Sequence, residues 1–595
     1  MFMERARHYG LDSPAAVVAS VAAIAIVPLS AILGYVLMEI PCYADFCIEH
    51  VQPMAKTHSQ VALGVFYAWM ATLILIMACA RKKPYLHAFL RRPIAGTSVG
   101  EVLTFTSLAM LLLFNFVYFW FKVEDLLSSP AYLKRKLVPA RRKAFFSAMF
   151  TGKLTDVALG VTMLFSAKNT ALQTLLGVSY EKSIRVHRFM GYFLVLAVAM
   201  HTILYVVYTA QYRTREDLLS VLFYGSQKSA THDHPLGWGE GNWMTTMGTY
   251  STLILAPVFF TSLPPVRRAF FNLFYYSHFL VFPSMLFAWL HAASDFYYMI
   301  PGLGLYFVDL FLRLGRFVRP VDIRHVTREP TGHVRVDFAW PTEVFGACKP
   351  GQWVFVNCPA VSKLEWHPYS MAQAPGSETA TIMFRPKEGK TKEFENALAA
   401  RLFGASDVEH GGAKIASPNV TFRIDGPFGT PLEAMERCAA VLCFVGGTGL
   451  APGMGVARGA LKAGVPSVKL FWSSREEGSE RVSLVEELNQ EGADVHLYHT
   501  GATTINTDMI QTNIASAETA QDAKADVVHS TPLPLPHQGR MVFSDLLESH
   551  VAPSGRTLVF LCGSDVFRRD ARRAAHALRT AKGGDIIVCE EGYEL

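Results

Sequence analysis

The hydrophobic residues of this chain follow one pattern before about residue 320 and another after it. In the first part they form continuous runs, and about 20 apolar residues are enough for a helix to cross a bilayer. Eight runs are predicted to span a membrane: 15–38, 60–80, 100–121, 146–166, 187–209, 246–262, 270–292 and 295–315. The first is too long for a cleaved signal peptide and predicts a retained span.

Beyond Pro320 the apolar positions alternate with polar ones over short segments. Residues 333–340 and 352–358 predict strands of an antiparallel barrel that extends to about residue 435. A continuous apolar strand at 439–445, a glycine-rich turn and a helix from about Gly453 then open a βαβ array that runs to the end. Residues 501–540, rich in Thr, Ala, Asp, Gln and Pro, are predicted to be a mobile insertion.

The charges fit a membrane protein and not a nucleic-acid-binding one. Only 17% of the residues are charged, the mean hydropathy is +0.24, and the net charge of +6 lies mainly in loops between apolar runs. Eight spans place both termini on one side, which we expect to be cytoplasmic because basic loops stay inside. The basic loop 122–145 would then lie outside, so either a span is miscounted or this loop is a vestibule for an anionic substrate.

The nine cysteines form no CxxC pair and no zinc-ligand spacing. The six in the second half, from Cys348 to Cys589, are expected to be reduced thiols. Cys42 and Cys47 follow the first span, where either a small extracellular disulfide or two free thiols would fit.

Four of the 20 histidines lie within apolar spans: His187 and His201 in one, His278 and His291 in another. At 1.5 Å per residue the first two are roughly 21 Å apart and the second two roughly 20 Å. A single such histidine is typical of a buried polar contact, but two pairs at near-equal spacing favour metal ligation. We predict parallel helices that hold two haems, with His187 opposite His278 and His201 opposite His291. Imidazole on both faces of each iron suits electron transfer.

The second histidine spacing also predicts a distortion. Fourteen residues bring a helix back to within about 40° of the same face, whereas thirteen miss it by about 140°. Pro283 lies between His278 and His291 and cannot donate a backbone hydrogen bond. A kink or an overwound turn is therefore expected there.

The segment 367–375, HPYSMAQAP, resembles the flavin motif of the ferredoxin–NADP reductase superfamily. The resemblance implies that Tyr369 stacks on the isoalloxazine, that Ser370 faces its N5, and that His367 lies by the pyrophosphate. Further FAD contacts are expected at Pro368, Arg385, Lys390, Thr391 and Gly426.

A second glycine-rich motif is predicted to bind a dinucleotide. Gly446, Gly447, Thr448 and Gly449, with Pro452, follow a buried strand and open a helix, where a pyrophosphate is favoured. Arg475 is placed to meet a 2′-phosphate, which favours NADPH over NADH, or is a solvated arginine. By resemblance, Cys562 and Gly563 lie at the nicotinamide, and Tyr593 covers the flavin.

Over residues 100–595 the chain resembles the ferric reductase and NADPH oxidase superfamily. Residues 166–191 and 261–268 look especially like ferric-chelate reductases, and within that branch like the protozoan ferric iron reductases. The oxidases carry a histidine four residues after the outer haem ligand, whereas this chain has Tyr205 there. That departure argues against dedicated superoxide production.

The resemblance implies a multi-domain membrane protein. We expect an all-α transmembrane bundle, with a six-helix haem core and about two extra N-terminal helices, followed by a ferredoxin-reductase-like FAD β-barrel and an α/β NADPH-binding domain. The expected boundaries are 1–99 for the extra helices, 100–319 for the haem domain, 320–435 for the FAD domain and 436–595 for the NADPH domain.

The implied activity is that of an NADPH-dependent ferric-chelate reductase. It would pass electrons from cytosolic NADPH through FAD and two haem b groups to extracytoplasmic Fe(III), or to cupric ion, and support iron uptake at the plasma membrane. The alternatives are an NADPH oxidase that makes superoxide and a membrane channel or scaffold that has lost catalysis. His232 and His234, in an outer loop, either contact iron or are ordinary loop residues. The sequence leaves open the chelate, the oligomeric state and the regulation.

Overall fold

The computed structural model describes most of the chain, in two compact units that divide between Leu312 and Arg313. Each unit is considered by itself. The four-part domain division stays a prediction. The described residues are 14–40, 56–94, 97–128, 139–168, 176, 178–210, 215–223, 242–317, 320–386, 393–403, 413–415, 420–429, 432, 435, 437–501, 535–582 and 585–591.

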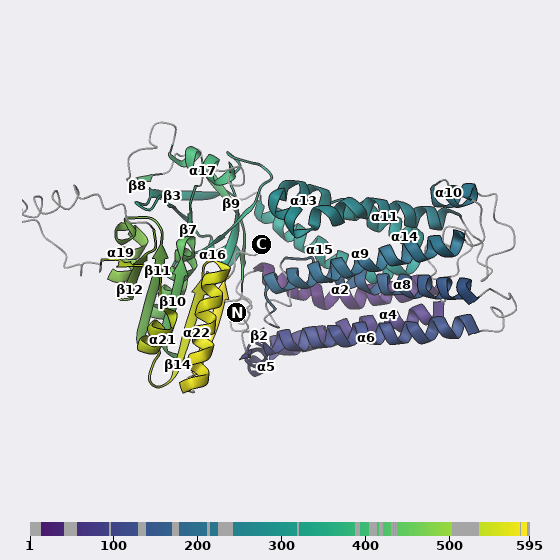
Figure 1. The fold of residues 1–595 in the computed structure, drawn as a ribbon, viewed down its shortest axis with the longest axis horizontal. Coiled ribbons are helices and arrows are strands. Elements are labelled where there is room, and N and C mark those ends of the chain that lie inside the picture. Colours follow the sequence, from purple (N-terminus) through teal and green to yellow (C-terminus); the bar gives the residue numbers. More distant parts are fainter. Residues whose placement is uncertain are drawn as a thin grey trace, which may run out of the picture. The chain divides into compact units, whose positions relative to one another are not determined.

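The first unit is a bundle of long helices (Figure 1). Helices occupy all eight predicted runs, the seventh in two pieces: α2 (Pro14–Glu39), α4 (Lys56–Lys82), α6 (Val99–Ser128), α8 (Pro139–Leu164), α9 (Tyr180–Ala210), α11 (Asn242–Ser262), α13 (Phe271–His278) with α14 (Val281–His291), and α15 (Ala293–Phe317). Shorter elements connect them: α5 (Pro84–Leu90), β1 (Pro93–Ile94), β2 (Thr97–Ser98), α10 (Arg215–Phe223) and α12 (Pro264–Ala269).

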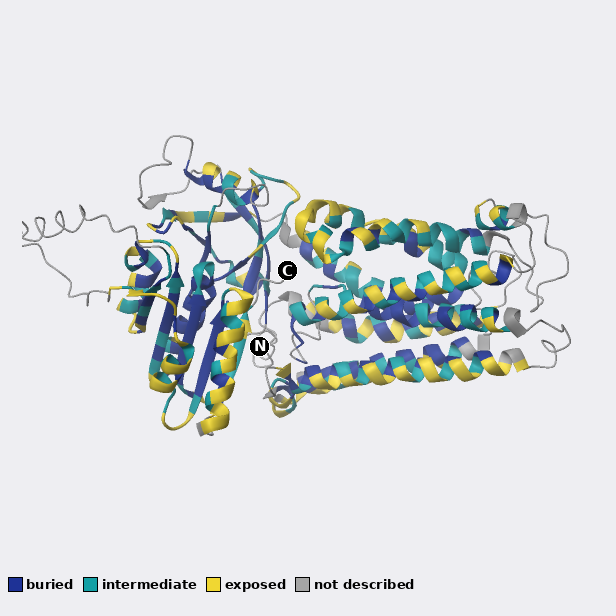
Figure 2. Ribbon diagram, in the orientation of Figure 1, coloured by how far each residue is buried: buried dark blue, intermediate teal, exposed yellow. Residues whose placement is uncertain are grey.

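Five segments of the described chain are long and apolar enough to cross a membrane: Val21–Glu39, Ser59–Ala80, Val99–Asp125, Tyr180–Ala210 and Phe271–His291. Large apolar side chains on these helices point outward, among them Leu29, Leu75 and Met110, each more than 60% exposed. Figure 2 shows exposed residues, in yellow, at intervals along the helices of this unit. Such a surface is suited to lipid and not to water.

The two extra N-terminal helices are part of the bundle core. The Tyr67 hydroxyl on α4 donates to the carbonyl of Tyr297 on α15 at 2.8 Å. Phe66 packs edge-on against Tyr298, with ring centroids 5.0 Å apart. Helix α4 also contacts α6, where the Trp69 indole donates to the Ser107 hydroxyl at 3.0 Å. Of the two predicted extra helices, α4 therefore packs against both α15 and α6, and α2 contributes Ala23, Val27 and Met38 to the same hydrophobic core.

Polar caps fix where two of the membrane helices begin. At the start of α6 the Ser98 hydroxyl accepts from the Glu101 N–H while the Glu101 carboxylate accepts from the Ser98 N–H, a reciprocal capping box. Helix α9 begins at Tyr180, because the Ser179 hydroxyl accepts from the N–H of Lys182. The predicted start at residue 187 was too late because the first two turns of α9 carry charged residues that a hydropathy pattern excludes.

The predicted distortion before Pro283 is confirmed. The N–H groups of Phe279, Leu280 and Phe282 each donate to the carbonyl three residues earlier instead of four. Pro283 has no N–H to bond the Phe279 carbonyl, so the helix tightens and separates into α13 and α14 at this point.

The second unit begins with an antiparallel barrel. Its strands are β3 (Val321–Arg328), β4 (Val334–Ala339), β5 (Trp353–Asn357), β6 (His367–Ser370), β7 (Thr379–Phe384), β8 (Ala413–Ile415) and β9 (Thr421–Phe428). They pair in the order β6-β5-β9-β3-β4-β7, with β8 beside β3, and a bridge between Met371 and Ile382 closes the ring. Two helices accompany the strands: α16 (Thr342–Phe345) and α17 (Glu393–Phe403). The predicted barrel is confirmed.

A parallel sheet follows, as predicted. Its strands are β10 (Cys438–Gly446), β11 (Ser467–Ser474), β12 (Asp494–His499), β13 (His537–Gln538), β14 (Arg556–Cys562) and β15 (Asp585–Glu591). Their order is β13-β12-β11-β10-β14-β15, and every pair is parallel. The chain moves outward from β10 and then returns to β10's other side at β14. That reversal creates a crevice at the carboxyl ends of β10 and β14, where α/β sheets bind ligands.

Helices cover both faces of this sheet. The helices α18 (Leu450–Lys462) and α19 (Ser483–Gln490) pack on one face, and α21 (Phe543–His550) and α22 (Asp565–Lys582) on the other. Strands β10, β11 and β14 are consequently dark along their length in Figure 2. Most of the predicted insertion, residues 502–534, lies outside the described residues.

Candidate functional site

The four membrane histidines meet in the two predicted pairs. The ring centroids of His187 and His278 are 6.1 Å apart, and those of His201 and His291 are 6.0 Å apart. An imidazole–metal bond is about 2 Å, and each ring nitrogen lies about 1 Å from its ring centre, so two axial imidazoles on one metal have centroids about 6 Å apart. Both pairs have the spacing that a bis-histidine haem requires.

Backbone carbonyls set the proton position on three of these rings. The Nδ1–H of His187 donates to the Thr162 carbonyl at 2.9 Å, and that of His201 donates to the Ala148 carbonyl at 2.7 Å. In the second pair of helices, His291 donates in the same way to Met244 at 2.7 Å. A carbonyl can only accept, so Nδ1 carries the hydrogen in each case. The lone pair then lies on Nε2, the nitrogen left to ligate a metal.

His278 has a different and weaker partner. Its Nδ1 is 3.5 Å from the Ser262 hydroxyl, which can donate or accept. Each histidine-bearing helix is nevertheless supported by one neighbouring helix. Helix α8 anchors both histidines of α9, and α11 anchors those of α13 and α14.

Glycines let the neighbouring helices approach the outer histidine pair. A Cβ on Gly152 of α8 would lie 2.9 Å from the ring of His201. A Cβ on Gly248 of α11 would lie 2.7 Å from Nδ1 of His291. Either distance is shorter than side chains tolerate, so each ring rests directly against the backbone of its anchoring helix. The residues present therefore fit a pair of haems.

A buried ionic cluster adjoins the outer pair, and the sequence reasoning missed it. Lys153 Nζ is 3.2 Å from an Asp156 carboxylate oxygen and 3.1 Å from the Ser294 hydroxyl. Asp295 is buried and interacts electrostatically with Asp156 and Lys153. Lys153 and Asp156 also interact electrostatically with both His201 and His291. Asp156 and Asp295, charged residues inside predicted spans, were the available signal, since buried intramembrane charges are usually functional.

Tyr205 lies beside the outer pair. Its ring centroid is 6.3 Å from that of His201, and its hydroxyl is 3.5 Å from the Thr245 hydroxyl. The phenol therefore faces a polar neighbour on α11.

The flavin motif forms strand β6 at the edge of the barrel. Tyr369 is buried in the barrel core against Phe384, its hydroxyl has no hydrogen-bond partner among the described residues, and burial raises the pKa of this phenol. His367 stacks on Phe394 of α17 with centroids 4.0 Å apart, and Pro368 is exposed. The Tyr369 hydroxyl is therefore an unsatisfied polar group inside the barrel, and the stacking of this ring on the isoalloxazine stays a prediction.

Ser370 meets a partner that the sequence did not suggest. Its hydroxyl donates to the carboxylate of Glu591, the last residue of β15. The contact joins residues 221 positions apart, from the barrel and from the edge of the parallel sheet. Glu591 thus becomes a candidate site residue, and only its position beside the predicted Tyr593 hinted at this. Tyr593 itself lies outside the described residues.

The other predicted FAD residues are partly described. The backbone of Gly426 has φ +144°, a conformation that favours glycine, and a Cβ there would lie 3.2 Å from Val354. Arg385 forms an ion pair with Glu476, beyond the end of β11. Lys390 and Thr391 lie outside the described residues.

The glycine-rich turn and the Cys562 motif are brought together at the crevice between β10 and β14. A Cβ on Gly449 would lie 2.9 Å from the Cys562 carbonyl and 3.2 Å from its sulfur. A Cβ on Gly446 would lie 4.0 Å from the Cα of Gly563. The turn, Gly447–Gly449 with Thr448 at its centre, leads into α18, whose first turn contains Pro452. Because the turn lies this close to Cys562 and Gly563 with no side chain between them, the N–H groups at the start of α18 are open to a pyrophosphate.

Arg475 and Glu476 lie just beyond the carboxyl end of β11, the strand beside β10. Arg475 is exposed, as a residue that meets a 2′-phosphate must be. Burial alone would raise the pKa of Glu476, but Arg385 and the Ser474 hydroxyl lower it below its ordinary value. Acidic residues at this strand end bind the ribose hydroxyls of NAD, while an arginine accommodates NADP. Both types are present here.

Several other expectations fall outside the described residues. They concern the possible disulfide between Cys42 and Cys47, the central basic residues of the loop 122–145, and His232 with His234. The six cysteines of the second half are thiols that form no disulfide with any described residue, as expected.

Comparison with known families matches three consecutive parts of the chain. The family "Ferric reductase like transmembrane component" matches residues 151–289, which include all four membrane histidines. "FAD-binding domain" matches 320–432 and "Ferric reductase NAD binding domain" matches 438–576. The chain belongs to the ferric reductase and NADPH oxidase superfamily.

Members of both branches of this superfamily are similar to the chain. "Ferric reduction oxidase 2" of Arabidopsis thaliana is 23% identical over 377 residues, 62% of this chain and 48% of its own. A superoxide-generating NADPH oxidase heavy chain of Dictyostelium discoideum is 23% identical over 374 residues, 58% of this chain and 52% of its own. The chain spans about half the length of the curated relatives it matches.

Among solved structures, a flavohemoglobin from Malassezia yamatoensis is similar over 76% of this chain and 97% of its own, at 14% identity and a TM-score of 0.34. The chain thus combines a part that matches a ferric-reductase-like transmembrane component with parts that match FAD-binding and NAD-binding domains, and its described residues include five segments long and apolar enough to cross a membrane.

Proposed function

We propose that this protein is a ferric-chelate reductase that carries electrons from cytosolic NADPH, through FAD and two haem b groups, to Fe(III) on the other side of the membrane. The cofactors supply the redox chemistry when bound, and the protein holds them in place. The two histidine pairs, 6.1 and 6.0 Å between ring centroids, are the observation that carries this proposal.

Within the membrane, the task of the protein is to hold four imidazoles rigidly. Carbonyls of α8 and α11 fix three of the four rings in one tautomer, and Ser262 supports the fourth. A haem held by both histidines of a pair would have no coordination position left for oxygen. This arrangement supports a role in which the two metals pass electrons on and bind no substrate.

In the second unit, the proposed task of the site residues is to hold NADPH against FAD. Ser370 on β6 would face the flavin, with its hydroxyl fixed by Glu591, and stacking of Tyr369 on the isoalloxazine is part of the proposal. The glycine turn lies against Cys562 and would hold the pyrophosphate, and Arg475 would meet the 2′-phosphate. NADPH is preferred over NADH in this proposal because Arg385 already neutralises Glu476.

The acceptor assignment rests on Tyr205. By resemblance, the oxidases carry a histidine at this position, which supplies a positive or hydrogen-bonding group to oxygen. A phenol that contacts Thr245 supplies no cation, and this supports a metal chelate over oxygen as the acceptor. The runner-up is an NADPH oxidase, supported by the similarity to the Dictyostelium enzyme. We further propose plasma-membrane location, cytoplasmic termini and a role in iron uptake.

The decisive experiment uses the full chain in sealed vesicles with NADPH on the flavin side only. A ferric chelate trapped inside should be reduced, and superoxide dismutase inside should not change the rate. Reduction that superoxide dismutase abolishes would favour the oxidase. Reduction that proceeds equally with the chelate on the NADPH side alone would exclude transfer across the membrane.

A further inference from the structure

One stripe of α18 joins the nucleotide-binding turn to the flavin motif. A Cβ on Gly455 would lie 2.6 Å from the Met371 carbonyl, and one on Gly459 would lie 2.2 Å from Pro350. On the same helix Arg458 donates to the Ala372 carbonyl at 3.0 Å, and Lys462 donates to the Pro375 carbonyl at 2.6 Å. Positions 455, 458, 459 and 462 share one helix face. The helix that begins at the glycine turn therefore lies directly along residues 371–375.

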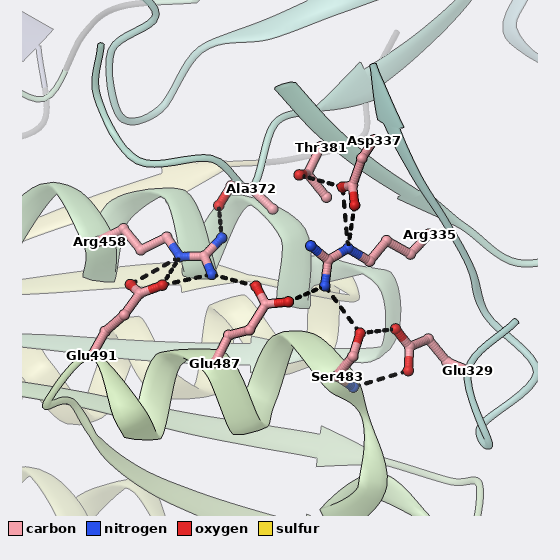
Figure 3. Close-up of polar contacts among 9 residues, drawn as sticks. All are labelled: Glu329, Arg335, Asp337, Ala372, Thr381, Arg458, Ser483, Glu487 and Glu491. Carbon is pink, nitrogen blue, oxygen red and sulfur yellow. Dashed lines mark hydrogen bonds and ion pairs between the residues drawn. The ribbon is translucent and has the colours of Figure 1, made fainter. Parts of the chain in front are cut away.

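Arg458 is the anchor of this contact. Its side chain is 8% exposed. Besides Ala372 it binds both carboxylate oxygens of Glu491 at 3.0 Å and Glu487 at 2.7 Å. Figure 3 shows its guanidinium between these two glutamates of the α19 region and the carbonyl from the flavin motif. A planar guanidinium makes these contacts at fixed angles, which lysine cannot do.

A second arginine, which comes from the barrel, also binds Glu487. Arg335 on β4 pairs with Glu487, donates to the Ser483 hydroxyl at 3.0 Å and binds Asp337 at 3.1 Å (Figure 3). Burial would raise the pKa of Glu487, but the hydrogen bonds from Arg335 and Arg458 hold it below its ordinary value. Glu487 is thus an ionised bridge between the barrel and α18.

The start of α19 is also fixed by the barrel. The backbone N–H of Ser483 donates to Glu329 at 2.9 Å, and its hydroxyl donates to the other oxygen of the same carboxylate. A carboxylate at a helix N-terminus is favourable, but here it comes from the preceding domain of the same unit. The nucleotide-binding sheet is therefore clamped to the barrel at α18 and at α19.

This clamp bears on the reaction because of where α18 begins. Arg458 lies nine residues after Gly449, about 13.5 Å along the helix axis. A rigid helix held at Arg458 holds the glycine turn, and with it the Cys562 side of the crevice, at a set distance from the flavin motif. A 1 Å displacement of reacting groups can cost about 100-fold in rate.

We propose that Arg458 is a positioning residue for hydride transfer: through Ala372 and Glu487 it sets the distance between the nicotinamide and the flavin. This inference rests on the proposed function in assuming NADPH and FAD as the reactants. Arg458 touches neither of them and acts through α18.

The test measures flavin reduction alone, so it does not depend on the acceptor. Full-length protein is mixed anaerobically with NADPH, and the rate of flavin bleaching and the long-wavelength charge-transfer band are followed. Arg458→Lys keeps the charge but loses the simultaneous contacts. It should slow flavin reduction about 10- to 100-fold and weaken the band, with the NADP⁺ dissociation constant changed less than threefold.

Two further variants separate positioning from folding. Gly455→Ala leaves every charge in place but drives a methyl group against the Met371 carbonyl, and it should slow flavin reduction in the same way. Arg556→Lys is the matched control, because Arg556 pairs with Asp585 within the sheet at 2.8 Å, and it should behave as wild type.

The outcomes are distinct. Arg458→Lys and Gly455→Ala proteins that bleach their flavin within twofold of wild type, or that lose only NADPH affinity, would overturn the inference and leave the proposed function intact. A wild-type protein whose flavin is not reduced by NADPH would overturn both.

Discussion

The tightest contact around the candidate metal centres is between Gly248 and His291, and it allows a quantitative prediction. A Cβ at residue 248 would lie 2.7 Å from Nδ1 of His291 and 3.0 Å from two ring carbons. To restore ordinary contact at about 3.4 Å, the ring must retreat by about 0.7 Å. The same Nδ1 donates to the Met244 carbonyl at 2.7 Å, so the retreat stretches that hydrogen bond to its limit.

The cost of Gly248→Ala follows from these two effects. Overpacking costs about 1–3 kcal/mol, and weakening a buried hydrogen bond costs about 1 kcal/mol more. Partners that orient a metal-bound histidine are worth about 10- to 100-fold in metal affinity. We therefore expect Gly248→Ala to lose the outer haem under limiting haem and to reduce a ferric chelate at least tenfold more slowly. Flavin reduction by NADPH should be unchanged.

The assay is the ratio of haem to flavin in purified protein, with the chelate reduction rate alongside. Gly64→Ala is the control. Gly64 lies on α4, which carries none of the four histidines, a Cβ there would meet no atom within 4 Å, and the substitution carries the same gain in helix propensity. A Gly248→Ala protein with the full haem ratio and wild-type turnover would refute the idea that this glycine seats the ring.

Three further predictions address the acceptor, the nucleotide and the broken helix. Tyr205→His should raise the share of turnover that superoxide dismutase inhibits, measured with cytochrome c, since an imidazole replaces the phenol; an unchanged share would remove Tyr205 as the discriminating feature. Glu476→Gln should increase the NADPH-to-NADH ratio of kcat/KM by about 3- to 10-fold, because a carboxylate near the 2′-phosphate is lost; an equal change for both nucleotides would count against a ribose-end position. Pro283→Ala should let residue 283 donate to the Phe279 carbonyl, rotate His291 away from its partner and halve the haem content, and wild-type haem content would contradict that interpretation.

The haem side of the site was predictable from sequence because its geometry repeats. The spacings 187–201 and 278–291 indicated the pairing, and the difference between fourteen and thirteen residues indicated the overwound turn at Phe279–Leu280. Helix starts were harder. Ser179 caps α9 through Lys182, a local signal, but the charged first turns masked it.

The nucleotide half shows where such reasoning stops. The apolar pattern predicted the barrel and the parallel sheet, and the structure brings the predicted glycine turn against Cys562. The sequence did not indicate that Ser370 contacts Glu591 or that Arg335 and Arg458 both bind Glu487. These contacts join residues 29 to 221 positions apart, and no periodicity encodes them. The contacts of Ser370 and Arg335 depend on how the barrel packs against the parallel sheet, and that of Arg458 on how α18 packs beside α19.

The central claim is that each chain holds two haems between paired imidazoles. The most direct test is the haem content and spin state of protein purified after haem-replete expression. The account predicts two low-spin haem b groups per flavin, and one after His201→Ala with NADPH binding retained. Protein without Soret absorbance, or with high-spin haem that binds added ligands, would contradict it.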